Sequence, residues 1–273
     1  MENGKWKMET MGVLLPKGLI DRFRADFLNV YVYQSRPEMG AAAAAAVSAY
    51  LQHLIIERGR AVGIFASAPS QNEFLDELVR LRGIDWTRVI GFHLDEYLGI
   101  DDQSPQSFRK YLVDRLVSKV PMAEFHGLRG EAANPDAVCA NYAAMLKSRP
   151  PDFAALGIGE NGHLAFIDPP FCDFNDPAAV KVVELDETCR RQQVHDGSFA
   201  SLDEVPLRAI SLTIPTIVSC RRLFVIVPGP RKQAAVYNTI RGQVTTDCPA
   251  SILRTHADAH LFMDKDAAEL VLT

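Results

Sequence analysis

The stretch FAALGIGENGHLAF, residues 153–166, is a short apolar run that ends in a polar turn rich in glycine. A short apolar run bounded by turn residues is typical of a buried strand, so we predict a strand over 153–159. The turn that follows holds His163 directly after Gly162. Asparagine and glycine suffice for such a turn, so the histidine points to a chemical role.

The same strand pattern recurs on both sides of this stretch, with longer helical patterns between the strands. Strands are predicted at 28–33, 61–67, 88–94, 153–159, 221–229 and 259–264. Helices are predicted at 36–58, 70–83, 107–120 and 231–242. Alternating strands and helices predict an α/β fold of three layers, with a mostly parallel, Rossmann-like sheet flanked by helices on both faces.

The first predicted helix carries clear signals at both ends. Ser35 and Glu38 have the spacing of a capping box, and Pro37 lies in the first turn. Gly59 follows the last turn and is expected to end the helix. We find no internal repeat or domain linker, and we expect residues 1–273 to form a single domain. The less regular stretch 169–206 is expected to hold an insertion or a lid.

The composition restricts the classes of function. The chain has 29 basic and 34 acidic residues, a formal net charge of −5 at pH 7. A nucleic-acid-binding protein needs a basic surface, so no nucleic-acid partner is expected. A local basic pocket for a small anion remains compatible with this charge. The oligomeric state is left open, and a homo-oligomer is one of the options.

The cysteines and the N-terminus indicate a cytoplasmic protein. The five cysteines are odd in number and include no CxxC pair, which fits neither a disulfide framework nor a zinc site. Residues 1–12 contain no apolar signal core. No run approaches the roughly 20 apolar residues that span a bilayer, so no membrane partner is expected.

Three polar stretches follow predicted strands, at 66–72, 93–99 and 159–166. Ligands of open α/β sheets bind beyond the carboxyl ends of the strands. All three stretches are therefore expected along one edge of the sheet. Their clustering is a stronger sign of a binding site than any one of them.

The stretch HLDEY places Asp95 and Glu96 directly after an apolar strand. A carboxylate tuned by burial can act as a general base, whereas a structural role would make it a cap. Adjacent strand residues point to opposite faces, so one carboxylate at most faces the substrate. We assign the catalytic role to Asp95 and keep Glu96, the more structural of the two, among the substrate-binding candidates.

His163 and Asp168, five residues later, form the second chemical pair. A nearby acid orients a histidine ring and favours its charged form. No serine or cysteine lies at a G-x-S-x-G turn, which argues against a nucleophilic triad. No H-x-x-x-H pair is present, so no metal is expected. Histidine with carboxylates is a general acid–base set.

Two βα loops are candidates for holding an anion. The loop ASAPSQN offers free backbone N–H groups and polar side chains, among them Ser67, Ser70 and Gln71. The loop GPRKQ places Lys232 at a helix start, where a cation is unfavourable unless it holds an anion. In ETCRRQQ, Arg190 and Arg191 are either surface residues or phosphate ligands.

LDEYLG and GIGENGHLAFIDPP together resemble the glucosamine-6-phosphate deaminase/isomerase family, whose fold is shared with the 6-phosphogluconolactonases. The similarity in order and spacing covers roughly residues 25–265. The resemblance implies that glucosamine 6-phosphate is opened, isomerised from aldose to ketose, and deaminated to fructose 6-phosphate and ammonia. It implies a phosphosugar substrate and no metal or organic cofactor.

By motif position, the resemblance makes Asp95 the base that moves a proton between C2 and C1. It makes His163 the group that assists ring opening from a neighbouring strand end, with Asp168 as its partner. Lys232 and Arg190 stand near the family's phosphate-binding lysine and arginine. The expected catalytic set is Asp95, His163, Asp168 and Asn161, and the expected substrate-binding set is Ser67, Ser70, Gln71, Glu96, Gly162, Arg190 and Lys232.

Three departures from the family pattern bear on the site. ASAPSQ replaces the glycine-rich phosphate loop, which indicates either phosphate binding by side-chain donors or a different substrate. Asn161 replaces an aspartate, which leaves His163 with less electrostatic support for its charged form. Asp168 replaces a glutamate, so either a shifted backbone brings its shorter side chain to the histidine or the contact with the histidine is weaker.

Two alternatives remain open. One is a 6-phosphogluconolactonase-like hydrolase, against which the tyrosine of DEY counts, because lactonases of this fold usually carry arginine there. The other is a sugar-phosphate sensor without catalytic activity. Sensors of this fold carry a DNA-binding helix-turn-helix, whereas only about 27 residues precede the first predicted strand and none of them forms a basic cluster.

Overall fold

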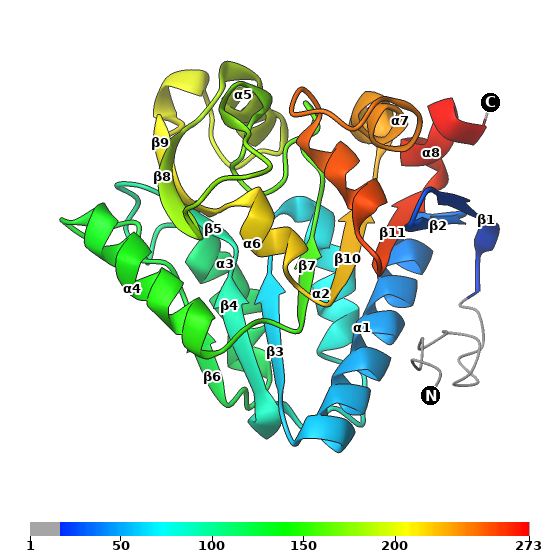
Figure 1. The fold of residues 1–273 in the computed structure, drawn as a ribbon, viewed down its shortest axis with the longest axis horizontal. Helices are drawn as coiled ribbons and strands as arrows, with labels where there is room; N and C mark the ends of the chain where they lie inside the picture. The colour runs from blue at the N-terminus through cyan, green and yellow to red at the C-terminus, as the bar shows by residue number, and fades with distance from the viewer. Residues whose placement is uncertain (1–16, 273) are drawn as a thin grey trace.

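The computed structural model describes residues 17–272, and the expectation about a signal core in residues 1–12 lies outside them. A large sheet of eight strands runs through the molecule, and its central arrows point towards the side where α5 and α7 lie (Figure 1). Its strand order is β1-β2-β11-β10-β7-β3-β4-β6. The strands are β1 Leu19–Ala25, β2 Leu28–Tyr33, β3 Ala61–Phe65, β4 Val89–His93, β6 Glu124–His126, β7 Phe153–Leu156, β10 Arg222–Val227 and β11 Ala259–Asp264.

Every neighbouring pair in this sheet is parallel except the hairpin of β1 and β2. The predicted parallel sheet is therefore confirmed, with one antiparallel strand added at its edge. β1 was not predicted, because its exposed, charged sequence LIDRFRA lacks the apolar run of a buried strand.

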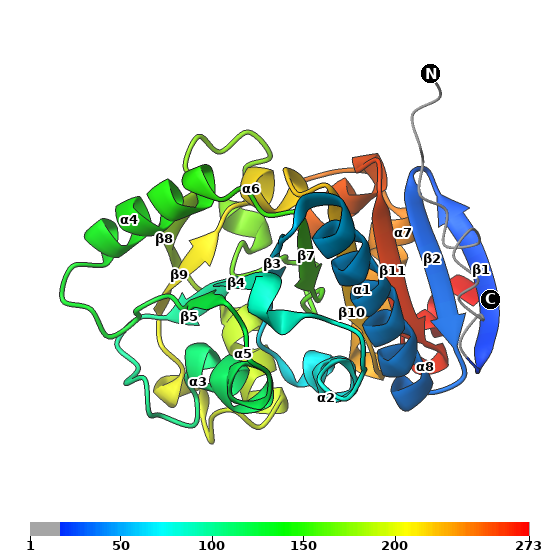
Figure 2. The same ribbon diagram turned by 90° about the horizontal axis from the view of Figure 1, so that it is seen from below.

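Helices cover both faces of the sheet, as predicted (Figure 2). α1, α2 and α3 bury their apolar residues against one face, and α4, α6, α7 and α8 against the other. Ile64 and Phe65, neighbours in β3, belong to different clusters, as the alternation of side chains in a strand requires. The helices are α1 Arg36–Arg58, α2 Asn72–Leu78, α3 Phe108–Arg115, α4 Pro135–Ser148, α5 Glu187–His195, α6 Ile214–Val218, α7 Gln233–Arg241 and α8 Lys265–Leu272.

α1 begins and ends where its sequence predicts. The Ser35 hydroxyl accepts a hydrogen bond from the backbone N–H of Glu38 and donates one to its carboxylate. Gly59 ends the helix with φ 72°, a left-handed conformation that suits glycine. The small alanines of this helix lie against the sheet, where they allow a close approach.

The expectation that no segment is long and apolar enough to cross a membrane was wrong on length and composition. Among the described residues, α1 meets both criteria. Of its most apolar window, 67% is buried inside the protein, which is the behaviour of a helix in a protein core.

A second, antiparallel sheet in the order β5-β9-β8 was not predicted. Its strands are β5 Asp95–Tyr97, β8 Val180–Glu184 and β9 Arg208–Leu212. The stretch 169–206 is thus more regular than expected, since it contains β8 and α5. β5 follows β4 after one residue, so Asp95 lies where the chain passes from the large sheet to the small one.

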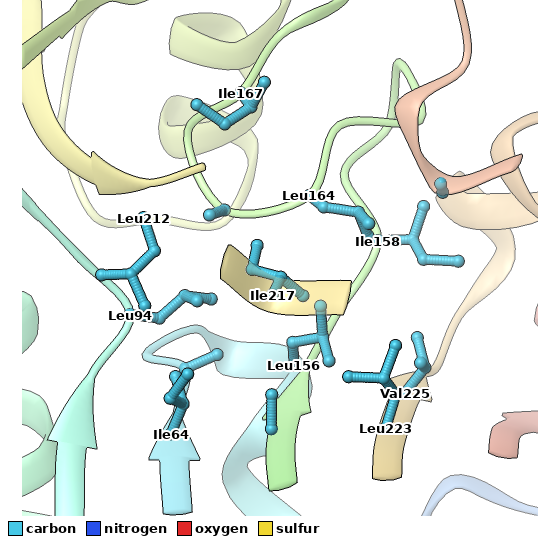
Figure 3. Close-up of a cluster of buried hydrophobic side chains, with 14 of the residues drawn as sticks. Ile64, Leu94, Leu156, Ile158, Leu164, Ile167, Leu212, Ile217, Leu223 and Val225 are labelled. Atoms are coloured by element: carbon cyan, nitrogen blue, oxygen red, sulfur yellow. The ribbon is translucent and has the colours of Figure 1, made fainter. Parts of the chain in front are cut away.

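The glycine-rich turn around His163 packs on buried apolar side chains. Ile158, Leu164 and Ile167 contribute to the cluster that also contains Leu156 of β7 and Ile217 of α6 (Figure 3). These side chains anchor both ends of the turn in the core, so the backbone at His163 is held in place between them.

Candidate active site

A cavity of about 260 Å³ lies at the carboxyl edge of the large sheet. Residues that follow β3, β4, β7 and β10 line it, together with the end of α5. The three polar stretches predicted to meet at one edge therefore do meet, through Ser67, Asp95 and His163. One detail of the prediction was wrong: β3 lies between β4 and β7, so Asp95 and His163 do not follow neighbouring strands.

Asp95 lines this cavity, and the residue is only 5% exposed. The carboxylate makes no hydrogen bond or ion pair with any residue of 17–272. Burial, and then the charge of Glu96, raise the pKa of Asp95 well above its usual value. A free carboxylate with a raised pKa in a cavity has the properties of a general base.

Glu96 does not face the cavity, which corrects its assignment as a substrate-binding residue. Its carboxylate accepts hydrogen bonds from the Ser107 hydroxyl and from the backbone N–H groups of Phe108 and Arg109. These groups form the start of α3, so Glu96 ties β5 to that helix. The two carboxylates thus point opposite ways, and Glu96 is the structural one, as the alternation in a strand suggests.

Replacing Glu96 with alanine should lower the free energy of unfolding by about 3 kcal/mol, because several largely buried donors lose their acceptor. Urea unfolding of the purified variant measures this loss. Glu184→Ala, at the exposed end of β8, is the matched control and should change stability little. A loss below about 1 kcal/mol for Glu96→Ala would contradict the structural role.

The His163 ring lies directly against Gly159, which explains one glycine of the motif. A Cβ atom at Gly159 would lie 2.2 Å from His163 Cε1, an impossible contact. Gly162 has φ 87°, a conformation that disfavours other residues. Gly162 therefore shapes the turn. It does not line the cavity, which corrects its assignment as a substrate-binding residue.

Asp168 is fully buried behind His163, with its Oδ1 atom 3.0 Å from His163 Nδ1. The two atoms are within ion-pair distance, but the N–H of Nδ1 is not well aligned with Asp168 or with any other acceptor in residues 17–272. Burial by itself would raise the pKa of Asp168, but His163, Asn161 and the backbone N–H of Asp186 hold it below the usual value. The carboxylate is therefore ionised and able to orient the ring.

The shorter aspartate reaches the histidine across a tight turn. Ala165, between the two residues, has φ 52°, and the Ile167 N–H donates to the Leu164 carbonyl to close a tight turn. Asn161 stabilises this arrangement from the other side. Its amide donates to Asp168 Oδ1 at 2.9 Å, and its oxygen accepts from the His163 backbone N–H at 3.0 Å.

Within the described residues, Cys189 of α5 joins His163 and Asp168, with all three potential ligand atoms within 4.8 Å of one another. The expectation of no metal rested on spacing along the chain and did not anticipate this cluster. Burial and the charge of Asp168 raise the pKa of Cys189 well above its usual value, so the thiol is protonated. Of the three residues, only His163 lines the cavity.

The loop after β3 offers hydroxyl groups to the cavity. Ser67 and Ser70 both line it. Ser67 donates to the Phe108 carbonyl and lies 3.3 Å from His93 Nε2. Gln71 is buried behind the loop, and its amide donates to Ser70 Oγ and to the Ile226 carbonyl. Ser70 thus accepts from within the protein and keeps its own proton for a ligand.

Lys232 lines the cavity from the loop after β10 and is only 7% exposed. Its ammonium group makes no hydrogen bond or ion pair with residues 17–272. Burial lowers its pKa, while the charges of Asp196 and Glu160 oppose this. Arg36 and Arg231 also line the cavity, and the Nε atom of Arg36 lies 2.7 Å from Glu73 Oε2. This basic end is where an anion would bind.

Arg190 does not reach the cavity, which corrects its assignment as a phosphate ligand. Its guanidinium donates to the Leu202 and Val205 carbonyls. Arg191 points to solvent and pairs with Glu187. The cavity residues that sequence reasoning missed include Arg36, Gln193 and His195. Arg36 is directly after the Ser35 cap, yet only the folded sheet brings the start of α1 to the loop of Ser70.

Comparison with known proteins agrees with this geometry. Residues 34–262 match the family described as glucosamine-6-phosphate isomerases/6-phosphogluconolactonase. The chain is 34% identical to the glucosamine-6-phosphate deaminase of Listeria welshimeri over 222 residues, which cover 80% of this chain and 92% of that protein. It is also 34% identical to the enzyme of the same name from an Exiguobacterium species over 192 residues, or 70% and 74% of the two chains.

Solved structures place the fold in the same group. A monomeric glucosamine-6-phosphate deaminase superposes with a TM-score of 0.80 at 29% identity, over 88% of this chain and 99% of its own. A 6-phosphogluconolactonase from Neisseria gonorrhoeae, described as putative, superposes with a TM-score of 0.70 at 21% identity, over 86% and 98% of the chains, and shares the fold. The chain therefore belongs to the glucosamine-6-phosphate isomerase/6-phosphogluconolactonase family.

Proposed function

We propose that this protein converts glucosamine 6-phosphate and water into fructose 6-phosphate and ammonia. The observation that carries the proposal is one cavity holding an unpaired carboxylate, Asp95, together with the His163–Asp168 pair. The reaction needs two separate acid–base groups, one for opening the sugar ring and one for moving a proton between carbons. The identity with the named deaminases over most of the chain supports the same reaction.

The proposed steps balance as follows. His163 gives a proton to the ring oxygen and takes the proton of the C1 hydroxyl group, so that the ring opens and the C1 aldehyde forms. Asp95 removes the proton from C2, which leaves negative charge on the C1 oxygen. His163 returns its proton to that oxygen, and Asp95 gives its proton to C1. The product is an imine at C2, and water replaces its nitrogen to release ammonia and the ketose.

The phosphate is proposed to bind at the basic end of the cavity. Lys232 supplies a largely buried positive charge without a partner among residues 17–272, and Ser70 supplies a free hydroxyl proton. Arg36 and Arg231 add charge at the rim. Side chains thereby replace the backbone N–H groups that a glycine-rich loop would present.

Incubating the pure protein with glucosamine 6-phosphate and assaying ammonia and fructose 6-phosphate tests the function. Equimolar formation of both products is expected. A parallel incubation with 6-phosphogluconolactone, followed by acid release, tests the lactonase alternative. Lactone hydrolysis without ammonia formation would replace the proposal, and the absence of both reactions would reject enzyme activity on these substrates.

Replacing Lys232 with alanine should raise KM for glucosamine 6-phosphate by about 10- to 100-fold, the range for losing a hydrogen bond to a charged group. Steady-state kinetics measure the change, and kcat should move less than KM. Lys147→Ala, at the exposed end of α4, is the control. An unchanged KM would remove Lys232 from the phosphate site.

A further inference from the structure

Gln193, at the end of α5, lines the cavity but has no role in the mechanism above. The residue is 5% exposed. Its carbonyl oxygen, Oε1, accepts a hydrogen bond of 2.6 Å from the Tyr97 hydroxyl. Its amide nitrogen makes no hydrogen bond with residues 17–272 and is not sealed off from solvent. One end of the amide is therefore held by the protein, and the other end is free.

Tyr97 holds this glutamine rigidly. Its ring packs against Phe108, Phe166 and Phe199, at centroid distances of 4.7, 5.1 and 5.4 Å. Burial raises the pKa of Tyr97 well above its usual value, so its hydroxyl stays protonated and donates. Because the amide oxygen accepts from this hydroxyl, the amide nitrogen is the free donor of a side chain that lines the cavity.

Tyr97 also links the glutamine to the strand that carries the proposed base. Asp95 and Tyr97 are two residues apart in β5, so their side chains leave the strand on the same face. Asp95 lines the cavity from that strand, and Gln193 lines the same cavity from α5.

We propose that the Gln193 amide N–H donates a hydrogen bond to the substrate's C1 oxygen while Asp95 moves the proton between C2 and C1. This inference rests on the proposed function and adds the group that stabilises charge in its central step. Removing the C2 proton places negative charge on the C1 oxygen. A fixed donor aimed at that oxygen stabilises the transition state more than the ground state.

The test uses Gln193→Met, which keeps the length of the side chain and removes the donor. We expect kcat for ammonia release to fall by about 100-fold, the size typical of one lost donor to an oxyanion, with KM changed by less than about threefold. Exchange of the C2 hydrogen with solvent should slow by the same factor. Arg191→Ala, on the exposed face of α5, is the control for disturbing the helix and should leave both rates unchanged.

A second variant separates the lost donor from simple disorder, because Gln193→Met also leaves the Tyr97 hydroxyl without its acceptor. The double variant Tyr97→Phe/Gln193→Met removes that orphaned hydroxyl. If the donor matters, the double variant stays as slow as Gln193→Met. In Tyr97→Phe alone, kcat should fall less, by about tenfold, because the Gln193 amide is present but no longer held in position.

The outcomes are distinct. Recovery of kcat in the double variant would show that the loss came from the stranded hydroxyl and would overturn the inference. An unchanged kcat in Gln193→Met, or a change confined to KM, would also overturn the inference while leaving the deaminase proposal intact. A wild-type protein that neither binds glucosamine 6-phosphate nor releases ammonia would reject the proposed function, and this inference with it.

Discussion

Replacing Asp95 with asparagine should lower kcat for deamination of glucosamine 6-phosphate by about 10³- to 10⁴-fold, at the upper end of what a general base contributes. The amide keeps the shape of the side chain but cannot accept the C2 proton. The Asp95 carboxylate makes no contact that supports the fold among residues 17–272, so the variant should fold and bind substrate normally. KM should therefore stay within a few fold of the wild-type value.

The decisive measurement is exchange of the C2 hydrogen in deuterium oxide, because it reports the proton transfer alone. Asp95→Asn should abolish this exchange while phosphosugar binding, followed by calorimetry, persists. Asp136→Asn, an exposed residue at the start of α4, is the matched control. Exchange at the wild-type rate in Asp95→Asn would show that another group is the base.

The pH dependence follows from the raised pKa of Asp95, which burial causes first and the charge of Glu96 second. The base acts in its ionised form, and protonation removes activity. An ordinary aspartate has a pKa of about 3.9, so the acid limb of kcat/KM should lie clearly above that value. An acid limb of kcat/KM near pH 4 would contradict the raised pKa of Asp95.

The elements that the sequence predicted are those whose pattern is local. α1 carries its own start signal in Ser35 and its own stop signal in Gly59, and both work as expected. β5 was missed because three residues are too few to show a period, and the residues that pair with it are more than 100 positions away in β9. The small sheet therefore becomes visible only when the chain is folded.

The site residues likewise divide into those that local sequence predicts and those that only the folded chain brings together. Asp95, His163 and Lys232 lie at strand ends or helix starts, where the rules for α/β sheets direct attention, and all three line the cavity. Arg190 was placed wrongly because its charge was read without knowing that carbonyl groups of the following segment surround it. Gln193 was missed because its role depends on Tyr97, 96 positions away, and glutamine alone carries no chemical signal.

Replacing His163 with glutamine should lower kcat on glucosamine 6-phosphate by about 10³-fold, within the range for a general acid–base group. Glutamine fills similar space and can still donate to Asp168, but it cannot carry a proton to and from the ring oxygen. The turn should persist, because Gly159, Gly162 and the Asn161 hydrogen bonds to the backbone and to Asp168 remain. His53→Gln, far from the cavity on α1, is the control.

An analogue that lacks the 4- and 5-hydroxyl groups isolates the ring-opening step, since it can close neither the five-membered nor the six-membered ring and stays in its open-chain form. His163→Gln should deaminate this analogue at nearly the wild-type rate, whereas Asp95→Asn should remain inactive on it. The two variants then separate the two acid–base groups of the cavity. Equal losses of His163→Gln on both substrates would place the histidine in a later proton transfer, and the assignment of ring opening to the His163–Asp168 pair would be wrong.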